Sequence, residues 1–158
     1  MKERSENEVG PFETNGIRID HLGIAVASLD SARALYESLG LKIASQETVE
    51  HEQVKVAMIP MEGGRIELLE PTSEDSPVGR FLRKRGEGLH HVALQVENIA
   101  ASLASLQACG VRLVNDQIQV GACGHLYFFV HPSSGRMYNG LSASGSLWPN
   151  LSSEWGSS

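Results

Sequence analysis

The fold is decided by residues 19–26, which read Ile-Asp-His-Leu-Gly-Ile-Ala-Val. Residues 89–96, Leu-His-His-Val-Ala-Leu-Gln-Val, repeat this apolar pattern with a histidine at the same place. The correspondence continues as far as Gly40 and Gly110, which take equivalent places in the two copies. Agreement over a strand, the segment after it and a later turn predicts two copies of one structural unit.

Each copy is expected to begin with a strand, because the repeated stretches are short, apolar and contain β-branched residues. A helix follows, capped by Ser28 or Asp30 in the first copy and by Asn98 in the second. The predicted fold class is α+β, with two tandem βαβββ modules. The remaining strands are expected at residues 42–49, 54–60 and 65–70, and at residues 112–118, 125–131 and 136–141.

These modules predict a single domain over residues 16–143, with module one at 16–71, a linker containing a helix at 72–88, and module two at 89–143. Residues 1–15 and 144–158 lack periodicity and are expected to be flexible tails. The second tail carries Trp148 and Trp155, which are unusual for a disordered segment.

The composition of the chain indicates which classes of partner and which cellular compartment are to be expected. The chain has 13 Lys and Arg against 19 Asp and Glu, so its net charge of −6 argues against a nucleic-acid partner. No apolar run is long enough to cross a bilayer, and the charged first residues argue against a signal peptide. Cys109 and Cys123 form neither a CxxC pair nor a disulfide framework, which favours a cytoplasmic protein.

Two histidines at equivalent places in the repeat are candidate metal ligands. Side chains alternate along a strand, so His21 shares a face with Gly23 and Ala25, whose small side chains would leave an open space before the imidazole. His91 occupies the same position in the second copy. A lone strand histidine is more often a hydrogen-bonded structural residue, but the repetition favours metal ligation. The opposite face is expected in the core, with Leu22, Ile24, Val26, Val92, Leu94 and Val96.

Glu67 is a third candidate ligand. Ile66 and Leu68 are expected to face the core, which places Glu67 on the opposite face. That carboxylate is either solvated on an edge strand or, if the sheet curls, directed towards His21 and His91. Two imidazoles with a carboxylate suit manganese, cobalt, iron, nickel or zinc.

The other histidines are expected to have other roles. His90 should point away from its neighbour His91 and be structural. His51 and His125 are predicted on the surface, and the role of His131, before a proline, stays open.

Residues 19–26 resemble the vicinal oxygen chelate superfamily, which includes glyoxalases, extradiol dioxygenases and antibiotic-resistance proteins. The match extends from about residue 17 to residue 135 and is more specific for the methylmalonyl-CoA epimerases. The segments that carry this narrower resemblance are 66–71 (IELLEP), 75–78 (DSPV), 81–94 (FLRKRGEGLHHVAL) and the Gly121…Gly124…His131-Pro132 stretch.

The resemblance implies a cupped mixed sheet, a homodimer and an acyl-CoA substrate whose (R)- and (S)-methylmalonyl forms are interconverted. It implies one divalent ion, most often cobalt or manganese, with nickel, iron or zinc as alternatives. By motif position the ligands are His21, Glu67 and His91. Glu52 matches a motif glutamate that has been proposed as a catalytic base; the alternative is an exposed loop carboxylate.

The last strand departs from the family pattern, which has a glutamate ligand after the His-Pro pair. Family spacing places Leu141 there, the internal repeat places Asn139 there, and alignment of the Gly-Arg pairs places Tyr138 there. None of these is a carboxylate, which indicates either a divergent tail or a disturbed reading frame. We therefore expect an epimerase with impaired activity. The alternatives are a glyoxalase-like lyase or isomerase acting on a glutathione-type adduct, and a metal-free small-molecule-binding module.

Overall fold

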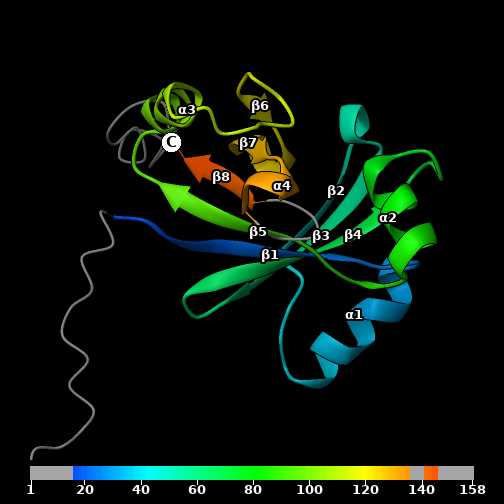
Figure 1. The fold of residues 1–158 in the computed structure, drawn as a ribbon. Helices are drawn as coiled ribbons and strands as arrows, with labels where there is room; N and C mark the ends of the chain where they lie inside the picture. The colour runs from blue at the N-terminus through cyan, green and yellow to red at the C-terminus, as the bar shows by residue number, and fades with distance from the viewer. Residues whose placement is uncertain (1–15, 136–140, 146–158) are drawn as a thin grey trace, which may run out of the picture.

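The two repeats form the two halves of one mixed sheet (Figure 1). The computed structural model describes residues 16–135 and 141–145. Within these residues the sheet has eight strands in the order β2-β3-β4-β1-β5-β8-β7-β6. The first half contains β1 (Arg18–Ala25), β2 (Ser45–Val49), β3 (Val54–Met61) and β4 (Gly64–Pro71). The second half contains β5 (Gly88–Val96), β6 (Gln119–Val120), β7 (Leu126–Val130) and β8 (Leu141–Gly145).

The strand pairing is the same in both halves, which confirms the predicted α+β fold with its repeated βαβββ unit. The first strand of each half pairs in parallel with the last one, β1 with β4 and β5 with β8. The last strand then pairs antiparallel with the one before it, β4 with β3 and β8 with β7. The antiparallel pair of β1 and β5 joins the halves at the centre of the sheet.

Helices follow the first strand of each half, as the sequence predicts. Helix α1 (Leu29–Ser38) is capped by Ser28 rather than Asp30, and α3 (Ile99–Ala108) is capped by Asn98. Each cap side chain accepts a backbone N–H of the first turn. Two further helices are α2 (Pro77–Arg85) between the halves and the short α4 (Pro132–Gly135), and two 3₁₀ helices are η1 (Glu50–Glu52) and η2 (Ala122–Gly124).

The sheet curls, so that its two edges meet. Strands β2 and β6 lie at opposite ends of the strand order. Nevertheless the Oγ of Ser45 on β2 lies 3.7 Å from the Sγ of Cys123 in η2, and Tyr127 on β7 donates a hydrogen bond to Glu52 in η1. These contacts close the sheet into a cup whose concave side carries residues of both halves.

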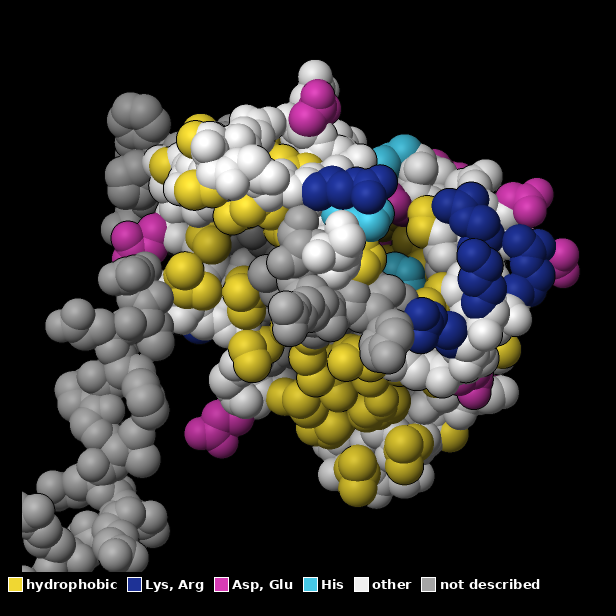
Figure 2. All heavy atoms as spheres, in the orientation of Figure 1, with side chains coloured by type: hydrophobic (Ala, Val, Ile, Leu, Met, Phe, Trp, Pro, Cys, Tyr) yellow, Lys and Arg dark blue, Asp and Glu magenta, His cyan; other side chains and the backbone are white. Residues whose placement is uncertain are grey.

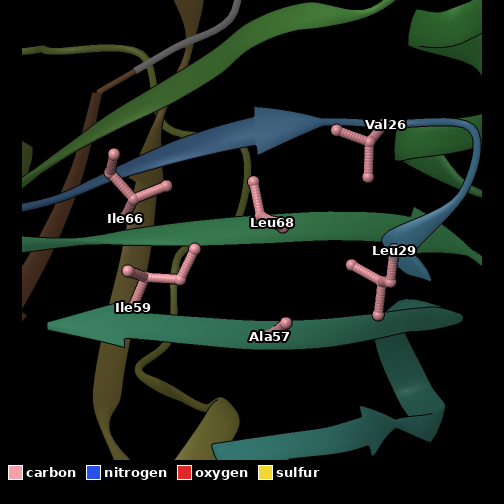
Figure 3. Packing of buried hydrophobic residues seen from close by; sticks show 6 residues of the cluster. All are labelled: Val26, Leu29, Ala57, Ile59, Ile66 and Leu68. Atoms are coloured by element: carbon pink, nitrogen blue, oxygen red, sulfur yellow. The ribbon is translucent and has the colours of Figure 1, made fainter. Parts of the chain in front are cut away.

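Buried apolar residues cover both faces of the first half. On the convex side a cluster packs beneath α1; it contains Val26, Leu29, Ala57, Ile59, Ile66 and Leu68 (Figure 3). On the concave side a second cluster packs against α2; it contains Ala25, Val54, Val56, Leu69 and Val78. The second half has its own cluster of Ile99, Leu103, Phe128 and Val130. Because the first half is packed on both faces, its strands form a firm support for polar side chains on the concave side.

The second half differs from the prediction in its outer strands. Residues 112–118 form no strand and contact β7 through an isolated bridge between Leu113 and Val130. The side chain of Asn115 explains the interruption, because its Oδ1 accepts the backbone N–H of Phe129 in place of a strand carbonyl. The last strand begins at Leu141, later than the expected 136–141.

The predicted tails are only partly described. Residues 1–15, 136–140 and 146–158, with Trp148 and Trp155, lie outside the described residues. Strand β8 extends to Gly145, two residues beyond the expected end of module two. Within the described part of the chain, no helix is long and apolar enough to span a membrane. Both cysteines are exposed and free.

Candidate metal centre

His21, Glu67 and His91 converge on the concave side of the sheet, from strands β1, β4 and β5. The Nε2 atom of His21 lies 3.0 Å from Nε2 of His91 and 3.3 Å from Oε2 of Glu67. Each of the three residues is at most 8% exposed. One ligand atom from each lies within 4.8 Å of the other two.

These separations suit a shared cation. Ligand atoms bound to one ion at about 2.1 Å lie roughly 3.0–3.4 Å apart in tetrahedral or octahedral geometry. The two measured distances from His21 fall within that interval. Two imidazoles and a carboxylate, buried together, are also a donor set that first-row divalent metals accept.

Paired β-bulges direct both histidines into the cup. The register between β1 and β5 shifts twice, leaving Asp20 as the extra residue on β1 and His90 as the extra residue on β5. A bulge re-aims the side chains around it. Each bulged residue directly precedes a candidate ligand, and the two bulges occupy equivalent positions in the repeat.

The bulge also explains why the prediction for His90 was wrong. His90 does not point away from the cup; its Nδ1 lies 3.0 Å from Nδ1 of His91, and its ring packs against Phe81. His90 lines the same cavity as His91. The bulge breaks the simple alternation of side chains on which the prediction relied.

Asp20 and Arg65 hold the first half of the centre. The Nδ1–H of His21 donates to Oδ2 of Asp20 over 2.7 Å, which leaves the lone pair of a neutral imidazole on Nε2, facing the centre. Arg65 donates to both carboxylate oxygens of Asp20, over 3.2 and 2.7 Å, and to Oε1 of Glu67 over 3.3 Å. The Arg65 guanidinium therefore holds the carboxylates of both Asp20 and Glu67. The second oxygen of Glu67, Oε2, remains directed towards His21.

Burial keeps the second half of the centre neutral. Burial lowers the pKa of His91 well below its usual value, and the nearby His21 and His90 lower it further. Burial also lowers the pKa of His90 to about 4. A neutral imidazole is the form that binds a metal, so His91 needs no deprotonation near neutral pH.

Gly23 makes room for His91. The two residues are paired across β1 and β5, and a Cβ atom on Gly23 would lie 2.2 Å from Cε1 of His91. The imidazole of His91 therefore occupies the room that the missing side chain of Gly23 leaves, while His21 faces an open cavity, as predicted. Ala93 takes the equivalent place in the second half and is fully buried.

The three residues line a cavity of about 590 Å³ that also contains Glu52 and Tyr127. Figure 2 shows a hollow with histidine side chains beside a group of Lys and Arg side chains. The Tyr127 hydroxyl donates to Oε1 of Glu52, so Glu52 is not an isolated loop carboxylate. Burial and then this hydrogen bond raise the pKa of Tyr127.

Tyr127 was missed by the sequence analysis, although a signal existed. Phe128 and Val130 are buried in the core cluster of the second half, and alternation along β7 places Tyr127 on the other face. Of the remaining histidines, His125 is exposed and half of the His51 side chain is exposed, as predicted. His131, whose role was open, lines the cavity.

The second half offers no carboxylate in the place that corresponds to Glu67. Glu67 lies beside Gly23 on the parallel neighbour of β1, and the equivalent neighbour of Ala93 is Ser142. The register thus assigns Ser142 to this place, not Asn139 or Tyr138, which lie outside the described residues. Leu141 pairs with Val92 instead. Strand β8 contains no acidic residue.

Comparisons with known proteins agree with the fold. The glyoxalase/bleomycin resistance protein/dioxygenase superfamily matches residues 20–129. An uncharacterised protein of Bacillus subtilis, YqjC, is 42% identical over 73% of this chain and 83% of its own length. The mitochondrial methylmalonyl-CoA epimerase of Bos taurus is 33% identical over 78% of this chain and 71% of its own length.

A solved structure of a methylmalonyl-CoA epimerase in complex with methylmalonyl-CoA and NH4+ superimposes with a TM-score of 0.77. It is 34% identical, and the alignment covers 82% of this chain and 94% of that one. The sequence match, the repeated fold and the converging His-Glu-His group lead to one conclusion. The chain belongs to the glyoxalase/bleomycin resistance protein/dioxygenase superfamily and is related to the methylmalonyl-CoA epimerases within it.

Proposed function

We propose that the protein is a metal-dependent acyl-CoA epimerase that interconverts (R)- and (S)-methylmalonyl-CoA. The observation that carries this proposal is the buried His21, Glu67 and His91 group, which opens into the cavity that also holds Glu52. The relationship to methylmalonyl-CoA epimerases supports the choice of substrate.

The substrate makes two chemical demands. Its reacting C–H lies between a thioester and a carboxylate, so loss of the proton places negative charge on an enolate oxygen. His21, Glu67 and His91 would hold a divalent ion, cobalt or manganese in our proposal, with nickel, iron and zinc as alternatives. Such an ion, when bound, supplies the positive charge that stabilises the enolate oxygen.

Glu52 is the proposed base. Among the described residues that line the cavity, Glu52 is the one carboxylate besides Glu67. The hydrogen bond from Tyr127 occupies Oε1 of Glu52 and leaves Oε2 for the substrate proton. Tyr127 is thus a positioning residue for the base.

Inversion also requires a proton donor on the opposite face of the substrate. The described part of the cavity provides no further carboxylate for this role, and β8 has none. We therefore expect Glu52 to exchange the α-proton with solvent faster than the configuration inverts. This imbalance is the form that impaired epimerase activity would take.

The proposal includes a homodimer working in the cytoplasm. Ile19 and Leu89, on the two central strands, are 55% and 48% exposed, and such apolar side chains are often covered by a second subunit. The free, exposed cysteines fit a reducing compartment. Light scattering of the purified protein measures the number of subunits.

Deuterium exchange tests the activity directly. Methylmalonyl-CoA is incubated in D₂O with the protein and added cobalt or manganese, and both α-deuteration and configuration are followed. We expect exchange above background that is abolished in His91→Ala and strongly reduced in Glu52→Gln. Exchange no faster than background with either metal would exclude this activity.

The missing carboxylate of β8 favours a second candidate, a metal-free module that binds a small molecule in the apolar-walled cavity. Metal analysis of the purified protein separates the two, because the epimerase retains about one ion per chain and the binding module retains none. A glyoxalase-like lyase would retain metal but would process a glutathione-type adduct instead of the acyl-CoA.

A further inference from the structure

Helix α2 places positive charge at the mouth of the cavity. Arg80, Lys84 and Arg85 line the same cavity as the metal-site residues, and all three are exposed. Figure 2 shows Lys and Arg side chains gathered over this helix beside the hollow. The chain as a whole carries a net charge of −6, so this concentration of cations contrasts with the remainder of the molecule. The contrast indicates an anionic ligand.

The start of helix α2 is closely packed, which fixes the backbone that carries these cations. The N-cap Ser76 is fully buried and accepts the backbone N–H of Gly79. A Cβ atom on Gly79 would lie 2.4 Å from the Ser73 carbonyl oxygen, which shows how closely the helix start is packed. Val78 belongs to the concave-side cluster, and Phe81 packs against it.

The carboxylates of the described cavity lining have partners elsewhere. Glu52 accepts from Tyr127, and Glu67 contacts His21 and Arg65. Arg83, on the same helix, does not line the cavity and pairs with Asp75 over 3.7 Å. The helix therefore separates cations that face the cavity from one that does not.

The cavity lining also contains apolar side chains, beside α2. Val54, Val56 and Leu69 line the cavity and pack with Val78 of α2 in the concave-side cluster. A ligand that fits would have an anionic group at one end, an uncharged linking arm and a reactive group at the other end. A thioester of coenzyme A has this construction, with its phosphates far from its acyl group.

We propose that Arg80, Lys84 and Arg85 bind the phosphates of the nucleotide half of coenzyme A. This inference rests on the proposed acyl-CoA function and assigns the part of the substrate that the candidate metal centre does not contact. Three cations on one helix match a ligand with several phosphate charges better than one with a single carboxylate.

Calorimetric binding of free coenzyme A to the full-length protein tests the subsite without turnover. In Lys84→Gln/Arg85→Gln we expect the Kd for coenzyme A to rise by about tenfold to a hundredfold, since each phosphate contact contributes modestly at an exposed site. Arg83→Gln removes one positive charge from the same helix, against two in the double variant, and should leave the Kd within about twofold of the native value. Adenosine 3′,5′-bisphosphate should compete with coenzyme A for the native protein.

Three results would overturn the proposal. One is a double variant that binds coenzyme A as tightly as the native protein; another is an equal loss in Arg83→Gln, which would indicate a nonspecific charge effect. The third is failure of the bisphosphate to compete. Circular dichroism and thermal midpoints of the variants show whether each is folded.

The two proposals fail separately. If coenzyme A binds with the expected pattern but no α-exchange occurs, the epimerase activity is excluded and the subsite stands. If exchange occurs and the KM for methylmalonyl-CoA is the same in Lys84→Gln/Arg85→Gln, the activity stands and the subsite is excluded.

Discussion

Module one contributes His21 and Glu67 to the candidate centre, whereas module two contributes His91. In the places that correspond by backbone register, module one has Glu67 beside Gly23 and module two has Ser142 beside Ala93. The two halves thus share a strand, a bulge and a histidine but differ in the carboxylate. The comparison shows that the duplicated backbone constrains where the ligands lie, while the side chains set the charge of the site.

The residues that precede the two histidines, Asp20 and His90, also differ in charge, and again module one has the carboxylate. Asp20 accepts the Nδ1 proton of His21 and is itself bound by Arg65. His90, its counterpart, is an imidazole packed against Phe81 with its pKa lowered to about 4 by burial. Module one is therefore the charged half of the centre and module two the neutral half. Such a site depends on module one for all the negative charge that the described residues bring to a cation.

Removing either histidine should produce the largest change. We expect His21→Ala and His91→Ala each to lower the affinity for Mn²⁺ or Co²⁺ by about a hundredfold or more, because loss of a ligand exceeds the tenfold to hundredfold cost of losing a supporting residue. Titration calorimetry measures the affinities. Glu37→Ala, at an exposed residue of α1 that pairs with Arg33, is the control. Equal affinity in all three variants would contradict the shared site.

Gly23→Ala should give the next largest effect. The added methyl group overlaps the His91 ring, so we expect a loss of about 1–3 kcal/mol in the free energy of unfolding, measured with urea. Metal affinity should fall as well, because the ring must move. The reverse change at the equivalent position, Ala93→Gly, overlaps with nothing and should cost at most about 1 kcal/mol. A larger loss in Ala93→Gly would contradict the assigned difference between the halves.

Ser142→Glu tests whether the asymmetry limits metal binding. The substitution places a carboxylate at the register position equivalent to Glu67, and we expect the affinity for Mn²⁺ or Co²⁺ to rise by about tenfold. Ser142→Gln, which has the same shape without the charge, should gain less. If Ser142→Glu binds Mn²⁺ or Co²⁺ no more tightly than the native protein, a carboxylate at position 142 does not reach the ion.

The neutral half should also make stability dependent on pH. In the unfolded chain His90 takes up a proton near pH 6.5, but in the folded metal-free protein it does so only near pH 4. Between these values the unfolded state binds more protons, so stability rises with pH and falls on acidification. The thermal midpoint should therefore drop from pH 7 to pH 5, and the drop should be smaller in His90→Asn. An unchanged pH dependence in that variant would contradict the burial of His90.

The repeat in the sequence was sufficient to predict most of the fold. The matched strands, caps and glycines specify β1, β5, α1 and α3, since each depends on local pattern. Alternation along β4 also placed Glu67 on the face opposite Ile66 and Leu68, and in the structure Glu67 lines the cavity while Ile66 and Leu68 lie in the convex-side cluster. That His21, Glu67 and His91 come together follows from the parallel pairing of β1 with β4 and the antiparallel pairing of β1 with β5.

The errors have a common physical origin in pairing between distant segments. The bulge at His90 is a property of the β1–β5 ladder, and no pattern within residues 89–96 indicates it. The contact of Tyr127 with Glu52 depends on closure of the sheet, and the contact of Arg65 with Asp20 depends on the parallel pairing of β4 with β1. The expected strand at 112–118 failed because the Asn115 side chain replaced a backbone acceptor.

The proposed site holds one cation between the two modules, bound by His21, Glu67 and His91. Anomalous diffraction at the cobalt absorption edge, from crystals grown with Co²⁺, tests it most directly. We expect one strong peak per chain at about 2.0–2.3 Å from Nε2 of both histidines and from a carboxylate oxygen of Glu67. A cobalt peak elsewhere on the chain, or none at this position with Co²⁺ in excess, would contradict it.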